Sequence, residues 1–281
     1  MKQYLLVTLS FVYFSLAAQS PWPRSKAGFF VQAAWQTIPT YNQIFESLNI
    51  PNVPLDREVT EHTFQLYGEY GLSPRTTLIA ALPVRFLKNG EFISYNFSVP
   101  QTPEGTLTGL GNASIGIRRA ILESELRLTG TLRLDFPSKR YDDLTGLRVG
   151  YNAWNLQPSL SIGMGFREIY WFGYAGYGLR SGGYSHYMNA GVELGIKLGR
   201  FHLAGFSEVV YSLENGDVVL PLRNRIKNLY VDNQSWLSFG AKSIFEANRF
   251  WGLNASFAGA SWAQFVPDSQ AIRLGAYFKW D

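Results

Sequence analysis

Several kinds of residue and segment are missing from this sequence, and each absence excludes a class of protein. The chain contains no cysteine, which excludes disulfide bonds and thiolate metal sites. Its formal net charge is only +4, too small to indicate a nucleic-acid partner. Beyond the N-terminus, no apolar run approaches the ~20 residues that a transmembrane helix requires. Aromatic residues, by contrast, are abundant at 16% of the chain, and their positions along the sequence are informative about the fold.

The first residues have the composition of a secretory signal peptide. Lys2 supplies a positive charge, residues 4–18 form an apolar run, and Ala17 and Ala18 precede Gln19. The run is too short to span a bilayer well. We therefore predict a signal peptide over residues 1–18, a short periplasmic segment over residues 19–26, and an exported domain over residues 27–281.

Apolar and polar residues alternate strictly along that domain. In residues 124–136, Leu126, Leu128, Leu132 and Leu134 alternate with polar residues over the roughly 9–11 residues of a tilted membrane strand. Strands of soluble sandwiches are usually only ~5–6 residues long. The same criterion predicts strands over residues 27–37, 59–72, 76–87, 107–121, 124–136, 153–166, 168–180, 184–198, 201–213, 234–246, 248–262 and 270–280. Tight turns alternate with long polar stretches, which are residues 38–58, 88–106, 137–152 and 214–233.

This pattern predicts an all-β fold. We expect a single transmembrane antiparallel up-and-down β-barrel of about 12 strands, with short periplasmic turns and longer outer loops. Within the first long stretch, residues 41–48 are expected to form a helical turn or two over the mouth of the pore.

The last predicted strand carries a second indication of membrane insertion. Its polar-x-Gly-x-x-aromatic-x-aromatic pattern is similar to the C-terminal signal by which bacterial outer-membrane proteins are handed to the barrel-assembly machinery. Arg273, Gly275, Phe278 and Trp280 occupy the positions of that signal, and Asp281 follows them. The pattern therefore predicts a location in the bacterial outer membrane, with membrane lipid and the assembly machinery as partners.

Tryptophan placement is an independent check on the membrane prediction. Seven tryptophans fall at the ends of predicted strands, and none falls in the middle of one. An indole ring prefers the headgroup level of a bilayer, so tryptophans at strand ends predict two aromatic belts. The expected interface residues are Trp35, Trp154, Trp171, Trp236, Trp251, Trp262 and Trp280.

Three segments resemble an outer-membrane family. The segment Tyr70-Gly71-Leu72-Ser73-Pro74-Arg75-Thr76-Thr77-Leu78 resembles the second hairpin of the phenol meta-cleavage-pathway (MetA-pathway) outer-membrane family. Residues 109–118 are similar to its Gly-x-Gly-Asp strand, with Asn112 where Asp is common, and residues 136–138 and 154–158 are similar to its loop and following strand. The resemblance implies a β-barrel that transports small, often hydrophobic compounds. Only residues 19–26 precede the first strand, too few for a plug domain.

Alternation also predicts which side chains face the lumen. We expect a mixed-charge network of Arg85, Arg118, Glu125, Arg127, Arg133 and Asp135 to narrow it. The alternative is a charge-selective constriction, although selective pores usually carry rings of one sign. Inward Tyr67, Tyr170, Phe172, Tyr174 and Tyr277 either offer a path for an apolar solute or serve as packing.

The predicted function is therefore an outer-membrane channel or transporter for small, hydrophobic or aromatic solutes. Alternatives are a structural or adhesive barrel and, less favoured, an outer-membrane lipid hydrolase. A hydrolase needs a serine activated by histidine, and neighbouring Ser185 and His186 would face opposite sides of a strand. We expect no enzyme activity, no cofactor, no metal site and no nucleic-acid partner.

Overall fold

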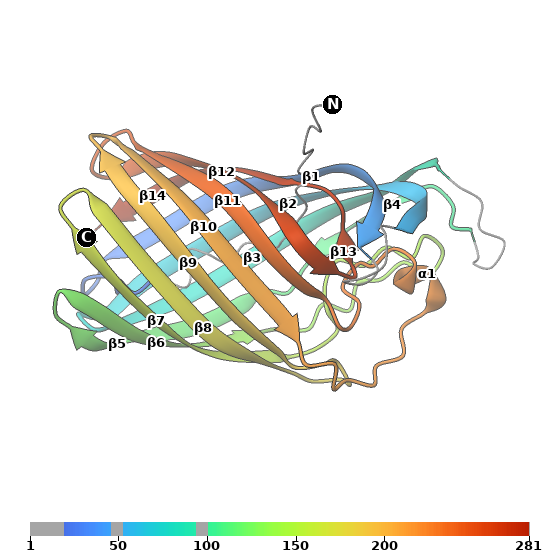
Figure 1. The fold of residues 1–281 in the computed structure, drawn as a ribbon, viewed down its shortest axis with the longest axis horizontal. Helices are drawn as coiled ribbons and strands as arrows, with labels where there is room; N and C mark the ends of the chain where they lie inside the picture. Colours follow the sequence, from blue (N-terminus) through green and yellow to red (C-terminus); the bar gives the residue numbers. More distant parts are fainter. Residues whose placement is uncertain (1–19, 46–52, 94–100, 281) are drawn as a thin grey trace, which may run out of the picture.

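The computed structural model describes residues 20–45, 53–93 and 101–280. The predicted signal peptide lies outside these residues. The described chain forms one closed, tilted barrel (Figure 1). No helix among the described residues is long and apolar enough to cross a membrane.

Twelve antiparallel strands make the wall, which confirms the predicted all-β up-and-down barrel. Each strand pairs with its neighbours in the chain, and β1 pairs with β14 from Phe29 opposite Trp280 to Thr37 opposite Ile272, which closes the sheet. β4 and β5 both pair with β3 and together form one wall strand, while β13 adds a short pairing at the end of β1. The strands are β1 Phe29–Phe45, β2 Val53–Ser73, β3 Thr76–Phe92, β4 Gly105–Leu110, β5 Ser114–Glu123, β6 Leu126–Asp135, β7 Asn155–Phe166, β8 Ile169–Arg180, β9 Tyr187–Leu198, β10 Phe201–Ser212, β11 Ser235–Glu246, β12 Trp251–Gln264, β13 Val266–Pro267 and β14 Ala271–Trp280.

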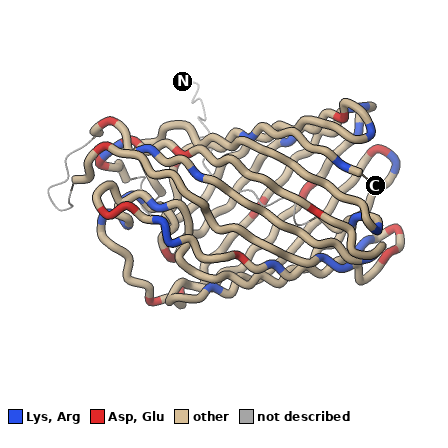
Figure 2. Tube along the Cα trace, turned by 180° about the vertical axis from the view of Figure 1, so that it is seen from behind, with Lys and Arg blue, Asp and Glu red and all other residues tan. Residues whose placement is uncertain are grey.

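Side chains alternate between two environments, as the sequence predicts. The outer wall is apolar: Leu160 and Leu194 leave 55% and 61% of their surface exposed. On the inner wall, Arg118 and Glu193 are almost completely buried. Figure 2 shows many of the charged residues near the two ends of the barrel. An apolar exterior around a polar interior is the arrangement of a barrel set in lipid.

The first three strands are longer than predicted. β1 continues to Phe45, β2 begins at Val53 and β3 continues to Phe92. Residues 41–45, expected to form a helical turn, are therefore strand, and the remaining residues of that prediction lie outside the described chain. Tyr41 and Ile44 are buried against other outer segments, which favours continued pairing over a free loop. The helix of this end, α1 Leu222–Arg225, comes from the loop before β11.

Candidate functional site: the barrel lumen

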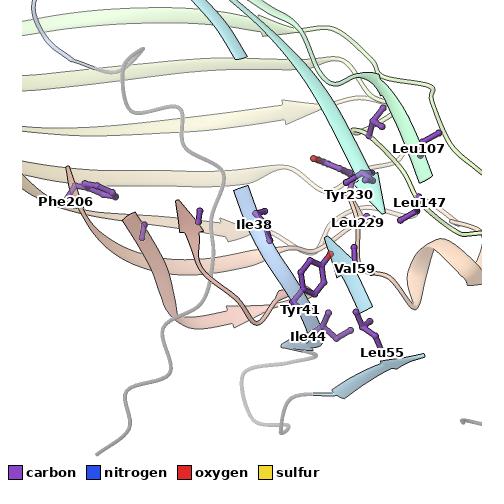
Figure 3. Close-up of a cluster of buried hydrophobic side chains, with 14 residues drawn as sticks. Ile38, Tyr41, Ile44, Leu55, Val59, Leu107, Leu147, Phe206, Leu229 and Tyr230 are labelled. Carbon is purple, nitrogen blue, oxygen red and sulfur yellow. The ribbon is translucent and has the colours of Figure 1, made fainter. Parts of the chain in front are cut away.

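The outer mouth of the barrel is covered by its own loops. Residues 136–154 and 213–234 fold over the extended ends of β1, β2 and β3 and bury a shared apolar cluster (Figure 3). Its members at this end include Ile38, Tyr41, Ile44, Leu55, Val59, Leu87, Leu107, Leu147, Val149, Leu229 and Tyr230. We call this assembly of loops and strand ends the outer cap.

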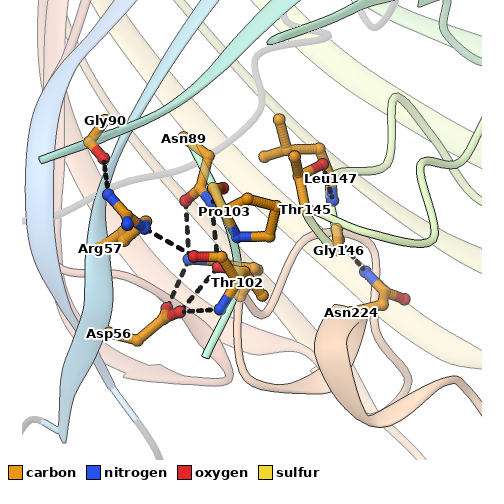
Figure 4. Close-up of polar contacts among 11 residues, drawn as sticks. Asp56, Arg57, Asn89, Gly90, Thr102, Pro103, Thr145, Gly146, Leu147 and Asn224 are labelled. Carbon is orange, nitrogen blue, oxygen red and sulfur yellow. Dashed lines mark hydrogen bonds and ion pairs between the residues drawn. The ribbon is translucent and has the colours of Figure 1, made fainter. Parts of the chain in front are cut away.

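A buried polar network fastens the outer cap. Lys227 Nζ lies 2.5 Å from Asp56 Oδ1 and donates to Asn89 Oδ1 at 2.7 Å. The backbone N–H and the hydroxyl of Thr102 both donate to Asp56 Oδ2, at 2.9 and 2.7 Å (Figure 4). Burial lowers the pKa of the Lys227 ammonium, while the ion pair with Asp56 opposes that shift. The pair joins residues 171 positions apart.

Asn112 ties the cap to the wall. It lies in the break between β4 and β5, within the glycine-rich segment that carries part of the family resemblance. Its Nδ2 donates to the carbonyl oxygens of Phe136 and Tyr151, both at 2.8 Å, and its Oδ1 accepts from the Tyr151 N–H at 2.8 Å. These three bonds fix the loop over residues 136–154 at both of its ends.

Beneath the cap lies a cavity of about 200 Å³, the middle cavity. Arg85 donates to Glu61 at 2.7 Å and lies 4.5 Å from the Tyr230 ring centre. Two strands along the wall from Arg85, Arg133 Nε lies 2.9 Å from Asp135 Oδ1. The remaining polar lining includes Gln36, Gln65, Asn155, Gln157, Arg180, Asn189, Glu208 and Arg273.

Toward the turns lies a larger cavity of about 560 Å³, the inner cavity. Its apolar lining is mostly aromatic: Trp22, Phe30, Tyr67, Tyr170, Phe172, Phe206 and Tyr277, with Pro23 and Ile244. Lys242 contacts both oxygens of Glu193 at 2.8 Å within it. Tyr67 and Arg273 line both cavities, so they stand at the boundary between the two spaces.

Five inward aromatic rings lie over glycines of the adjacent strand. A Cβ added at Gly195 would lie 2.3 Å from the Tyr170 ring, and one at Gly252 would lie 2.3 Å from Tyr277. Gly178 with Tyr187, Gly191 with Tyr174 and Gly240 with Phe206 repeat the arrangement, each pair in direct register. Rings that lie over glycine cover the wall rather than cross the lumen, which leaves space for the two cavities.

The segment before β1, predicted as a short periplasmic segment, enters the inner cavity. Arg24 Nε donates to Glu69 Oε2 at 2.7 Å, and Arg118 reaches both Glu69 Oε1 (3.1 Å) and the carbonyl oxygen of Trp22 (3.2 Å). The Trp22 ring meets Tyr170 and Phe172 edge-on, with centroids 6.0 and 5.8 Å apart. We call residues 20–25 the inner strap.

The six residues of the predicted lumen network lie in three places. Arg85, Arg133 and Asp135 line the middle cavity, while Arg118 holds Glu69 and the inner strap. Glu125 and Arg127 lie at the turn between β5 and β6, where Glu125 is exposed and the Arg127 guanidinium is 3.8 Å from Glu123. Their distance from the middle cavity follows from their position at the end of a strand.

Most of the predicted interface tryptophans face outward. Trp35, Trp154, Trp171, Trp251 and Trp280 are 38–52% exposed, and Trp262 is half-buried after a bulge opposite Leu237. Trp236 is different, because it is 6% exposed and lines the middle cavity. It shares its face of β11 with Lys242, so alternation alone places it inside.

The residues of the predicted insertion signal divide between the two faces of β14. Arg273 points inward and donates to Gln65 Oε1 at 2.8 Å, with Gly275 on the same face. Phe278 packs against Phe29 and Trp251, with ring centroids 5.5 and 4.6 Å apart. Trp280 stacks on Phe250 at 5.1 Å. The aromatic residues of the signal therefore belong to the aromatic belt on the outside of the wall, at the end of the barrel that carries the short turns.

In the described part of the chain, each of the three histidines contacts a group other than a serine hydroxyl. His62 Nδ1 lies 3.1 Å from Thr37 Oγ1. His186 accepts from the Arg180 N–H, and His202 lies 3.3 Å from Glu246. The expectation that the protein is not an enzyme stays a prediction.

Comparisons with known proteins agree on the architecture. No protein-family model and no curated protein matches the chain. Among solved structures, it is similar to the COG4313 outer membrane channel from Pseudomonas putida F1, with a TM-score of 0.69 and 13% identity over 96% of this chain and 100% of that one. It is also similar to the translocator domain of the autotransporter NalP from Neisseria meningitidis, with a TM-score of 0.50 and 14% identity over 90% and 88% of the two chains.

At these identities the likeness concerns the fold. It agrees with the barrel that the resemblance to the phenol meta-cleavage-pathway family implied. The chain thus has the fold of the COG4313 outer membrane channel along almost its whole length.

Proposed function

We propose that this protein is an outer-membrane channel for small solutes, with a preference for hydrophobic or aromatic ones. The observation that carries the proposal is a closed barrel with an apolar outer wall and two cavities in its lumen. The fold likeness to a solved outer membrane channel supports it. Export through a signal peptide over residues 1–18 and delivery by the barrel-assembly machinery belong to the same proposal.

The aromatic lining of the inner cavity supports the solute class. Trp22, Phe172 and Phe206 present apolar ring surface beside the ion pair of Lys242 and Glu193. Ligand sites commonly combine such apolar walls with a few polar groups that set orientation. A solute with one ring and one polar group fits this lining.

Both ends of the lumen carry a seal, and a channel must open both. The outer seal is the cap with its apolar cluster, and the inner seal is the strap held on Glu69. We expect the strap to open more readily, because it is one short segment. The cap, by contrast, combines two loops and three strand ends.

Proteoliposome swelling tests the proposal. Glucose and phenyl glucoside are a suitable pair of solutes, because both cross a protein-free bilayer poorly and phenyl glucoside is the larger molecule. A simple sieve would pass glucose faster, whereas an aromatic preference predicts that phenyl glucoside enters at least as fast. Swelling no faster than that of protein-free vesicles for either solute would overturn the channel proposal and favour a structural or adhesive barrel.

A further inference from the structure

Arg180 is held in an unusual position at the top of the middle cavity. Its guanidinium carbon lies 4.1 Å from the ring centre of Tyr151 and 4.3 Å from that of Tyr187. The side chain is only half-buried and lines the cavity. No carboxylate of the described residues lies within ion-pair distance of it.

Both rings are themselves fixed. The Tyr151 hydroxyl donates to Gln234 Oε1, and its ring meets Tyr230 edge-on at 5.3 Å. The Tyr187 hydroxyl accepts from Asn155 Nδ2 at 3.0 Å. When the faces of a guanidinium pack on aromatic rings, the N–H groups along its edge remain able to donate hydrogen bonds. Two of these N–H groups match the two oxygens of a carboxylate. The rings therefore hold Arg180 ready for a planar anion at no further ordering cost.

The other arginines of this cavity already have partners. Arg85 pairs with Glu61, Arg133 with Asp135, and Arg273 donates to Gln65. Together with Arg180 they place four positive charges around the cavity. The facing carboxylates are three, Glu61, Asp135 and Glu208. The cavity thus keeps an excess positive charge in a confined space, where a charge interacts more strongly than in bulk water.

A second group in the cavity is a buried donor without a hydrogen-bond partner. Trp236 lines it with 6% of its surface exposed, and its Nε1 has no hydrogen-bond partner among the described residues. An indole N–H can only donate, so it requires an acceptor oxygen. A buried donor without an acceptor is unfavourable, and an oxygen atom of a bound ligand would supply the missing hydrogen bond.

We propose that the middle cavity binds one small organic monocarboxylate. The carboxylate pairs with the edge of Arg180, and Trp236 Nε1 donates to the bound molecule. Its apolar body lies against Ile79, Ala81, Pro83 and Val210. The cavity volume is only about 200 Å³, so the ligand is small. The site lies on the proposed route and in this respect rests on the proposed function.

Isothermal titration of the detergent-solubilised protein with benzoate and benzamide tests this site. The two molecules share their shape, but only benzoate carries the charge. We expect benzoate to bind and benzamide to bind at least tenfold more weakly. The proposal would be overturned if benzamide bound as tightly as benzoate. It would also be overturned if folded protein, verified by its heat-modifiable migration, gave no binding signal with benzoate. Displacement of benzoate by chloride at equal concentration would overturn it as well, because a plain anion site would not select a carboxylate.

Variants locate the site. Arg180→Gln should weaken benzoate at least tenfold, and Arg180→Lys should recover only part of the affinity, since an ammonium lacks the fork. Trp236→Phe removes the second donor and should weaken benzoate by a smaller factor. The control is Arg225→Gln, an exposed arginine of the cap outside the cavity lining, which should bind as the parent does. Unchanged affinity in folded Arg180→Gln and Trp236→Phe would overturn the assignment.

Binding and flux are measured separately, so the two proposals fail separately. If vesicles swell in neutral glucose but the protein does not bind benzoate, the carboxylate site is refuted and the channel proposal stands. Benzoate binding that depends on Arg180, in a protein that conducts no solute, would refute the channel and leave a ligand site.

Discussion

The inner strap gives the sharpest test of how the lumen opens. Arg24 holds the strap through its side-chain bond to Glu69, while its backbone N–H donates to Thr77 Oγ1 at 2.8 Å. Arg24→Ala removes the side-chain bond to Glu69 and the contact of the guanidinium with the Phe30 ring, whose centre lies 4.9 Å away, and it keeps the backbone bond to Thr77. Glu69 keeps Arg118 and the Tyr67 hydroxyl, which donates at 2.7 Å, so the carboxylate is not left without a partner. The change therefore acts on the strap rather than on the barrel wall.

The magnitude follows from the type of bond. A hydrogen bond between charged groups contributes about 1.5–3 kcal/mol. Because every 1.4 kcal/mol is a factor of ten, the ratio of undocked to docked strap should rise roughly 10- to 150-fold. Trp22 packing against Tyr170 and Phe172 remains, so a docked population persists.

The absence of cysteine makes the assay direct. Ser20→Cys introduces a single thiol at the start of the strap, on the lining of the inner cavity. A bulky maleimide can reach it only when the strap leaves the cavity, so the labelling rate reports the undocked population. We expect labelling to be roughly 10- to 150-fold faster with Arg24→Ala added, and swelling rates to rise with it.

The matched control lies at the same end of the barrel. Arg75 pairs with Glu123 at 2.6 Å on an exposed turn and makes no contact with the strap. Arg75→Ala should leave labelling and swelling unchanged, because exposed pairs contribute little. Equal labelling rates in the parent and in Arg24→Ala would refute the view that this ion pair holds the inner seal.

Three further changes test other parts of the molecule. Leu160→Arg, on the outer face of β7, should lower the free energy of unfolding in lipid vesicles by roughly 2–4 kcal/mol, read from urea titration; an unchanged midpoint would contradict a lipid-facing position. Replacing Phe278 and Trp280 by Ala should reduce the heat-modifiable protein recovered from membranes, and normal recovery would separate them from insertion. Lys227→Met leaves Asp56 buried without its cation, at about 3–5 kcal/mol, and should expose the outer loops to protease; retained protection would rule out that role.

The sequence predicts the wall because a strand obeys a local rule. Period-two alternation identified the twelve wall strands to within a few residues, except where β1, β2 and β3 extend into the cap. The same rule also determines which side chains face the lumen. Trp236 illustrates this, since its parity with Lys242 on β11 already places it inside, against the preference of tryptophan for interfaces.

The seals and the sites depend on contacts that no local pattern encodes. Asp56 and Lys227 meet across 171 residues, and each reads in the sequence as an ordinary polar loop residue. Arg180 is the last residue of a strand, and its two rings come from a loop and from β9. Residues 19–26 are too few to predict a plug from the sequence. The inward glycines opposite aromatic residues indicate that the lumen holds space.

The two seals differ in what opening each one breaks. Opening the outer cap separates a buried ion pair and exposes an apolar cluster contributed by two loops and three strand ends. Separating a buried ion pair has a high free-energy cost, because each charge loses its partner while it is still poorly solvated. Opening the inner strap breaks the ion pair of Arg24 with Glu69, two further hydrogen bonds of the strap and the packing of the Trp22 ring. A solute that enters from the outer side therefore meets the larger barrier first. The middle cavity lies directly behind that barrier, and Arg180 packs there on Tyr151 of the cap. A ligand that binds Arg180 more tightly in one arrangement of the cap would therefore stabilise that arrangement.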